Sequence, residues 1–185
     1  MVSQTRPIAT VEEFEAYLQR PELGDESYEF IDGEIIEVVS NNYASRIAAK
    51  ILIKIGMWIE ANDLGDVTGA DGGYRIAGDR YVPDVAFISR QRQPEPFQGV
   101  WNPLAPDLAV EVVSDESSPK ELDRLMVKIS NYVAAGTTLW AVFPQAIIVR
   151  VHAPGQPVQT FGIDAVLAGG DLLPGFQLPV RDIFS

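Results

Sequence analysis

Two carboxylates interrupt apolar segments of this chain and are the residues best suited to chemistry. Asp84 stands in YVPDVAFIS, and Glu111 follows in LAVEVVS. Burying a carboxylate without a partner is costly, and a hard divalent cation such as Mg²⁺ offsets that cost well. The backbone carbonyl of Val112 supplies a candidate third oxygen ligand. A cation held there would stabilise charge developing on a phosphodiester and lower the pKa of a bound water.

A less reactive interpretation of the same two carboxylates is equally compatible with the periodicity. Asp84 would then only cap a turn, and Glu111 would face solvent on an edge strand. The residues that follow Glu111, VVSDE, do not separate these two interpretations.

Lys128 is the third candidate for the site. It lies four positions before Tyr132 on an expected helix, so the two side chains share one face, at the border of the apolar stripe. From there a lysine can extend past the core toward the strand ends and position an attacking water, with Tyr132 in support. The alternative is an ordinary solvated lysine.

Basic residues recur every fourth position on the first long expected helix, at Arg46, Lys50 and Lys54. Arg75 and Arg80, on the hairpin before Asp84, extend this set. Affinity for a phosphate backbone comes largely from Lys and Arg, and this chain has a formal net charge of -12 with 14 basic residues. We therefore expect these five residues to form the local nucleic-acid-binding surface, although such a line is also typical of a solvated helix face.

Composition limits the classes of site that the chain can build. The 185 residues are 46% hydrophobic, which suits one domain over residues 1–185. Cysteine is absent, so disulfides and thiolate sites are excluded, and the single histidine, His152, argues against a His-rich zinc site. We find no signal-type segment and no apolar run of membrane-spanning length, and we expect a cytoplasmic protein.

The expected elements explain how the carboxylates could meet. Thr10 and Glu13 form a capping-box pattern that starts a short helix over 10–20. The other patterns predict a hairpin over 28–39 around Asp32-Gly33, a helix over 42–62, strands over 66–76 and 80–89 joined at Gly78-Asp79, a loop over 90–106, a strand over 108–114, a helix over 119–135, and strands over 139–143 and 146–152. If strands 80–89 and 108–114 are antiparallel neighbours, Asp84 and Glu111 converge.

Several of these segments, in this order, resemble the PD-(D/E)XK nuclease superfamily, and within it the Uma-type branch of restriction-endonuclease-like proteins. The segments are Pro83-Asp84, Glu111-Val112-Val113, the Lys128 helix running into LWAVFP, YEFIDGEIIEV and DLLPGFQLPV. The resemblance implies an α/β (α+β) fold with a restriction-endonuclease-like core, in which helices flank a central mixed β-sheet, extended by an N-terminal helix and hairpin. It also implies a Mg²⁺-dependent DNA endonuclease, with Mn²⁺ able to substitute and with Asp84 and Glu111 as metal ligands.

The chain departs from the superfamily pattern at informative positions. Val113 stands where the superfamily has its lysine, and the branch places that lysine on the following helix, which matches Lys128. Asn41-Asn42-Tyr43 stands where branch members tend to have a histidine. Either Glu34 or Glu29 is expected to join the site.

Two further expectations concern activity and assembly. Restriction-type nucleases commonly pair so that two sites address two strands, and we therefore expect a homodimer. The alternative function is a catalytically weak or inactive nuclease-fold protein that binds nucleic acid or a protein partner.

Overall fold

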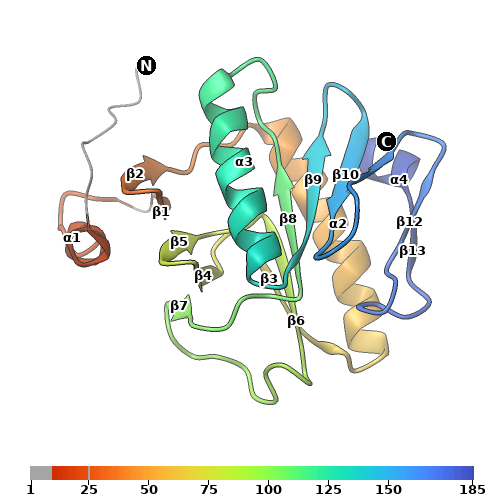
Figure 1. Cartoon of the computed structure of the whole chain (residues 1–185), viewed down its shortest axis with the longest axis horizontal. Helices are drawn as coiled ribbons and strands as arrows, with labels where there is room; N and C mark the ends of the chain where they lie inside the picture. The colour runs from red at the N-terminus through yellow and green to blue at the C-terminus, as the bar shows by residue number, and fades with distance from the viewer. Residues whose placement is uncertain (1–9, 25) are drawn as a thin grey trace.

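A five-stranded and a six-stranded β-sheet lie next to each other (Figure 1), and the short segment that carries Asp84 passes from the first to the second. The computed structural model describes residues 10–24 and 26–185. Its helices are α1 (Val11–Tyr17), α2 (Asn42–Ala61), α3 (Pro119–Ala134) and α4 (Val180–Phe184). Together the mixed sheets and flanking helices confirm the expected α+β architecture with its N-terminal helix and hairpin.

The larger sheet has six strands in the order β11-β10-β9-β8-β6-β3. These strands are β3 (Gly65–Gly69), β6 (Val85–Ser89), β8 (Leu108–Val112), β9 (Thr138–Phe143), β10 (Ile148–His152) and β11 (Gln159–Phe161). β8 and β9 are parallel and are joined through α3, whereas the other neighbours are antiparallel. The sheet is therefore mixed, and β8, the strand that carries Glu111, belongs to its one parallel pair.

The five-stranded sheet has the order β2-β1-β5-β4-β7. Its strands are β1 (Tyr28–Ile31), β2 (Glu34–Glu37), β4 (Gly73–Ile76), β5 (Asp79–Tyr81) and β7 (Trp101–Asn102). Asp32 and Gly33 connect β1 to β2 with positive φ values of 48° and 79°, which suits a tight hairpin turn. A separate two-stranded sheet pairs β12 (Val166–Ala168) with β13 (Gln177–Pro179).

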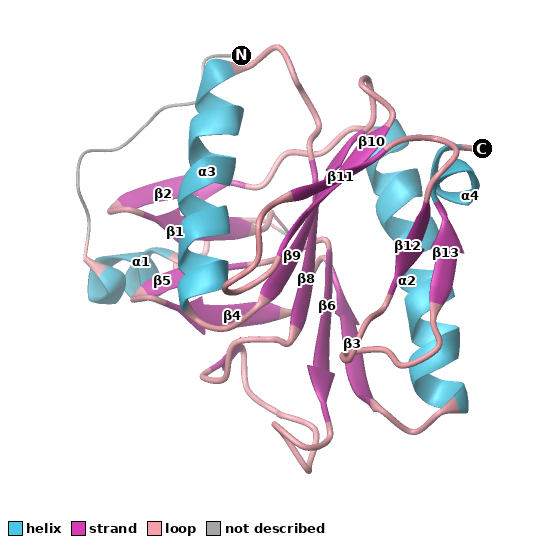
Figure 2. Ribbon diagram, turned by 45° about the vertical axis from the view of Figure 1, so that its right-hand side comes forward, coloured by secondary structure: helices cyan, strands magenta, loops and turns pink. Residues whose placement is uncertain are grey.

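Helices α2 and α3 cover opposite faces of the six-stranded sheet (Figure 2). The isoleucine stripe of α2 packs on one face, against side chains such as Val110 of β8 and Val142 of β9. On the other face α3 packs over the alternate residues of the same strands, including Ala109 and Ala141. Because side chains alternate along a strand, Glu111 must point toward α3.

Capping residues mark where the first three helices begin. Thr10 accepts a hydrogen bond from the Glu13 amide at 3.2 Å, and the Glu13 carboxylate accepts one from the Thr10 amide at 2.9 Å. Asn41 caps α2, while Ser118 caps α3 just before Pro119. The expected capping box and the two long helices are thus confirmed, with ends shifted by only a residue or so.

The expected strands over 66–76 and 80–89 are wrong in one respect, because each is split between the two sheets. The first breaks at the turn between β3 and β4, and the second breaks at residues 82–84, between β5 and β6. Pro83 has no N–H to donate to a ladder, and the Val82 amide donates instead to the Glu29 carboxylate at 2.7 Å. The expected loop over 90–106 also contains the short strand β7, which pairs with β4.

None of the helices in the described part of the chain is both long enough and apolar enough to cross a membrane. Trp140 and Phe143 of β9 belong to the core and are 3% and 8% exposed.

Candidate active site

Asp84 and Glu111 face each other across two neighbouring strands. Val85 of β6 pairs with Val110 of β8, so the register places Asp84 opposite Glu111 one residue further on. Cross-strand partners point to the same face of a sheet, which here is the face that α3 covers. The Asp84 carboxylate also accepts a hydrogen bond from the Val112 amide at 2.7 Å. The expected convergence of the two carboxylates is therefore what the strand pairing produces.

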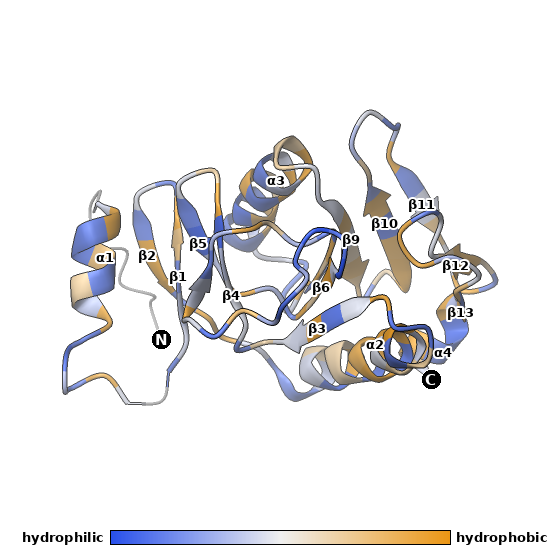
Figure 3. Cartoon of the chain, turned by 90° about the horizontal axis from the view of Figure 1, so that it is seen from below, coloured by the Kyte–Doolittle hydropathy of each residue, from blue (hydrophilic) through white to orange (hydrophobic). Residues whose placement is uncertain are grey.

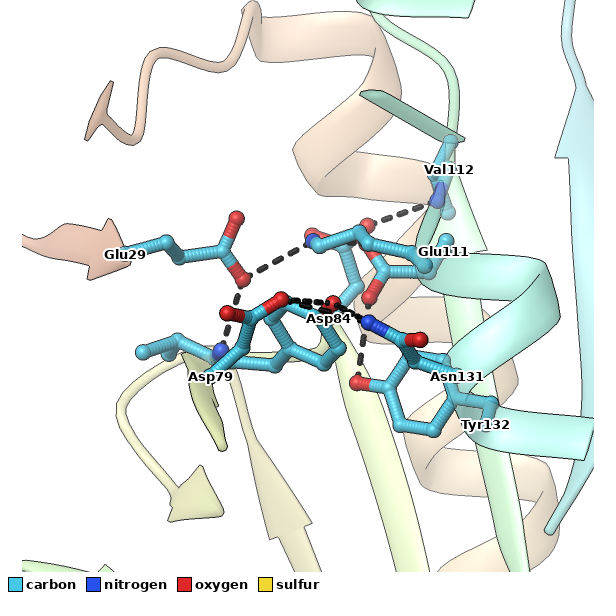
Figure 4. A network of polar contacts seen from close by, with 10 residues as sticks. Glu29, Asp79, Asp84, Glu111, Val112, Asn131 and Tyr132 are labelled. Carbon is cyan, nitrogen blue, oxygen red and sulfur yellow. Dashed lines mark hydrogen bonds and ion pairs between the residues drawn. The ribbon is translucent and has the colours of Figure 1, made fainter. Parts of the chain in front are cut away.

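The ammonium of Lys128 lies between the carboxylates of Glu29 and Glu111, both of which are labelled in Figure 4. Its Nζ is 2.8 Å from Oε2 of Glu111 and 2.8 Å from Oε1 of Glu29. Tyr132, one turn further along α3, donates its hydroxyl to Oε1 of Glu111 at 3.3 Å. Lys128 is only 7% exposed, so it is not a solvated lysine of the helix surface.

Of the two N-terminal glutamates, Glu29 joins this cluster and Glu34 does not. Glu29 is 5% exposed, and its Oε1 accepts both from Lys128 and from the amide of Val82. Glu34 lies at the start of β2 and pairs with Arg124 at 3.4 Å on a partly exposed surface. Sequence alone left this choice open, because both glutamates flank the same hairpin turn.

Three carboxylates and one ammonium give the cluster an excess of negative charge. Burial, reinforced by the charge of Glu29, raises the pKa of Asp84, although the Val112 amide and Lys128 oppose this. Burial and the charges of Glu29 and Asp84 likewise raise the pKa of Glu111 to about 8, against the opposing effect of Lys128. For Lys128, burial favours the neutral amine, but the charges of Glu111 and Glu29 outweigh it and raise the pKa. Lys128 is therefore protonated at neutral pH.

A second layer of polar contacts supports this cluster and was not anticipated from the sequence. The Asp79 carboxylate accepts the Tyr81 hydroxyl at 2.7 Å and the Asn131 amide group at 3.2 Å, and Asn131 also donates to the Tyr81 oxygen at 2.6 Å. The Lys128 ammonium lies 5.6 Å from the centre of the Tyr81 ring. The only sequence signal for Asn131 was its place on the same helix as Lys128 and Tyr132, whereas Asp79 looked like a turn residue.

A pocket of about 310 Å³ opens onto the cluster. Its base includes Asp84, Glu111 and Lys128, and one wall is the apolar surface of the β1–β2 hairpin. Lys120 and Arg124, from the first half of α3, line it as well. The carboxylates are thus accessible to a ligand that enters between the hairpin and α3.

The five basic residues expected to bind nucleic acid do not line this pocket. Arg46 and Lys50 both contact the carbonyl oxygen of Ser185. Arg80 is 7% exposed and forms an ion pair with Glu15 of α1 at 2.7 Å, because α1 covers this part of β5. Lys54 and Arg75 are exposed. A nucleic-acid-binding role for the five remains a prediction.

The donor atoms at the base of the pocket are hard oxygens. Among residues 10–24 and 26–185, no three side chains of the Asp, Glu, His or Cys types are arranged to hold a metal ion. Two carboxylates, Asp84 and Glu111, remain beside the backbone of Val112. Mg²⁺ commonly takes only one or two protein carboxylates and keeps several waters, so this donor set fits it. The excess negative charge of the cluster also favours a divalent cation.

Asn41 makes two structural contacts at the start of α2. Its side-chain oxygen caps α2 by accepting from the Ala44 amide at 2.9 Å. Its side-chain nitrogen donates to the carbonyl of Ser114 at 2.8 Å. Asn41 thereby ties the start of α2 to the segment that follows β8.

Comparison with known proteins agrees with this fold. One solved structure, described as a putative nuclease belonging to DUF820 from Anabaena variabilis, matches with a TM-score of 0.79 and 22% identity, over 95% of this chain and 97% of that one. At that identity the match shows a shared fold. No curated protein matches. The profile of the Uma2 family, described as putative restriction endonuclease, matches residues 11–181, and the chain therefore belongs to the Uma2 family.

Proposed function

We propose that this protein is a Mg²⁺-dependent nuclease that hydrolyses phosphodiester bonds in DNA. The observation that carries the proposal is the buried ammonium of Lys128, held 2.8 Å from both Glu29 and Glu111, beside Asp84 at the base of a pocket. Both the description of the family and the name of the structural neighbour support a nuclease.

Asp84, Glu111 and the Val112 carbonyl are the groups that would hold the cation. The N–H and C=O of one strand residue point to the same edge, and the Val112 N–H points to Asp84. The Val112 carbonyl therefore faces the same side as that carboxylate. When bound, Mg²⁺ supplies Lewis-acid stabilisation of the phosphoryl charge and lowers the pKa of water; Mn²⁺ offers the same chemistry.

Lys128 would act as a charged positioning group, because its raised pKa keeps it protonated and excludes it as a base. An ammonium has three N–H donors, and Glu29 and Glu111 account for two of them. The third can hold an attacking water or a phosphoryl oxygen near Asp84. We therefore propose that Lys128 takes the role that the superfamily pattern assigns to a lysine at the position of Val113.

Glu111 has to be ionised before it can bind a cation. With a pKa of about 8, Glu111 is largely protonated near neutral pH in the chain without metal, and its ion pair with Lys128 belongs to the ionised form. Cation binding would release that proton, so metal affinity should rise with pH.

Cleavage assays test the proposal directly. Plasmid and oligonucleotide DNA are incubated with the protein in Mg²⁺, Mn²⁺ or EDTA. We expect cleavage with either metal, and a loss of at least about a hundredfold in Asp84→Asn and in Glu111→Gln. Asp123→Asn, which changes an exposed carboxylate on α3, is the matched control and should cleave normally.

A second measurement does not depend on cleavage. Mg²⁺ should raise the melting temperature of the parent protein, since a ligand that binds only the folded state stabilises it. The two site variants should lose that increase, whereas Asp123→Asn should keep it. Full cleavage by both site variants would rule out this nuclease assignment.

The alternative is a binding module without catalysis. It is favoured by one observation, which is that Lys128 already contacts two of the three carboxylates. That function predicts DNA binding with no hydrolysis in any metal.

We also propose a homodimer, in which two pockets would address the two strands of a duplex. Sedimentation equilibrium would show twice the chain mass of 20.3 kDa. A single species at the mass of one chain, at all concentrations tested, would exclude it.

A further inference from the structure

We propose that Lys120 and Arg124 bind phosphates of the nucleic-acid strand as it enters the pocket along α3. The inference rests on the proposed function, because it names how that site would hold its substrate. Neither residue belongs to the basic set expected from the sequence.

The three cations of α3 form one line from the pocket mouth to its base. Lys120, Arg124 and Lys128 recur every fourth residue, so they share one face of the helix. All three line the pocket. Lys120 is exposed, the Arg124 side chain is 24% exposed, and Lys128 is buried. The line therefore descends from solvent to the carboxylates at the base.

The two outer cations are free to meet a phosphate, whereas Lys128 is already engaged. Arg124 has Glu34 as its partner at 3.4 Å, a long contact on a partly exposed surface that a phosphate can replace at little cost. The nearby carboxylate of Glu121, which also lines the pocket, accepts hydrogen bonds from the backbone amides of Ser114 and Asp115, at 2.6 and 3.2 Å. Its charge is thus partly compensated within the chain.

The opposite wall of the pocket argues for a strand rather than for a free anion. That wall comes from the β1–β2 hairpin and the residues after it, and it includes Ile31, Ile36, Val38 and Val39. Cations lie on the α3 side, whereas the hairpin side is mainly apolar and adds the exposed residues Glu37 and Ser40. A nucleic-acid strand has the same two sides, because its phosphates are charged and its sugars and bases present largely apolar surface.

The basic line of α2 offers no comparable arrangement. It projects from the helix on the far side of the six-stranded sheet, and Arg46 and Lys50 contact Ser185 there. Two surfaces thus compete for the same role, and substitutions confined to the α3 line can separate them.

The test measures binding by fluorescence anisotropy of labelled single-stranded and duplex DNA, with Ca²⁺ present, over a range of salt concentrations. The test variant is Lys120→Gln/Arg124→Gln, and the control is Arg20→Gln/Arg150→Gln, which removes the same charge from two exposed residues that belong to neither basic surface. We expect the test variant to weaken binding at least tenfold at low salt. The slope of log Kd against log salt should fall by about 1.4 to 1.8, the value for two phosphate contacts.

The control variant should bind within about twofold of the parent protein, and Arg124→Lys should recover part of the lost affinity. Weaker binding of only the duplex, or of only the single strand, identifies which form enters the pocket. Equal loss in the two double variants, or no binding by the parent protein, would overturn the inference.

This outcome is distinguishable from failure of the proposed function. If the parent protein cuts DNA and Lys120→Gln/Arg124→Gln binds normally, the nuclease stands and this inference fails. If the parent protein binds through these residues but never cuts DNA, the inference stands and the nuclease fails.

Discussion

The two faces of the six-stranded sheet are built from the same largely hydrophobic strands (Figure 3), and both are apolar, but the α3 face also includes a buried ion pair. On the α2 face, Ile47, Ile51, Ile55 and Ile59 pack against apolar strand residues, all 2% exposed or less. On the α3 face, Glu111 and Lys128 are buried as an ion pair within an otherwise apolar layer. Side-chain alternation along β8 alone produces both environments.

The two faces therefore contribute differently to stability and to chemistry. Burying apolar surface is the main favourable term in folding, and the α2 face supplies it without polar interruptions. A buried ion pair gives little net stability, because desolvation opposes the attraction between the charges. The α3 face therefore holds groups whose value is chemical, and the α2 face stabilises the sheet that positions them.

The largest expected effect concerns the pH dependence of the α3 face. Between about pH 4.5 and 8 the unfolded chain has lost the Glu111 proton while the folded chain keeps it, so folding stability falls as pH rises. Glu111→Gln removes this contribution. The free energy of unfolding of the variant, relative to that of the parent protein, should therefore increase as pH rises across this range, by up to about 5 kcal/mol in total. Urea unfolding in EDTA at a series of pH values measures the difference, and a constant difference across the range would contradict it.

The next effect tests the α2 face. Ile51 is fully buried, and Ile51→Ala should lower the free energy of unfolding by about 2–5 kcal/mol. Its pH profile should stay parallel to that of the parent protein, and cleavage per folded molecule should not change. A changed pH profile would show that the two faces are coupled. The same urea titrations provide the measurement.

The smallest expected effect concerns the second polar layer on the α3 side. Asn131→Ala removes the donor to Asp79 and to the Tyr81 oxygen, and should cost about 1–3 kcal/mol. Ser130→Ala changes the exposed neighbour on the same helix and should cost under about 0.5 kcal/mol. Thermal unfolding of both variants gives the comparison. Equal losses would mean that the Asp79 network adds nothing beyond helix propensity.

The convergence of Asp84 and Glu111 could be expected from the sequence only on the condition that their strands are antiparallel neighbours, which the strand pairing meets. Both strands have local apolar patterns, and antiparallel pairing alone then brings the two carboxylates together. The two long helices were predictable, because their apolar stripes and caps lie within the helices themselves.

Features that depend on distant segments were harder to predict. Lys128 has a long flexible side chain, so its position on the helix is compatible with either a buried or a solvent-exposed ammonium. The ion pair with Glu29, on a hairpin remote in sequence, stabilises the buried position. Arg80 looked like a surface cation because nothing near it in sequence indicates that α1 and Glu15 cover it. Pro83 did carry a local signal for the break between β5 and β6, since it cannot donate to a ladder.

One oxygen atom, Oε1 of Glu29, has a consequence for the order in which the molecule assembles. It accepts hydrogen bonds from the Val82 amide and from Lys128, and so joins three segments that are far apart in the chain. Contacts between such distant segments form late, because closing long loops costs entropy. A chain that has folded only in part, such as one still emerging from the ribosome, would lack the complete cluster. Any capacity to cut nucleic acid would then be acquired only at the end of folding.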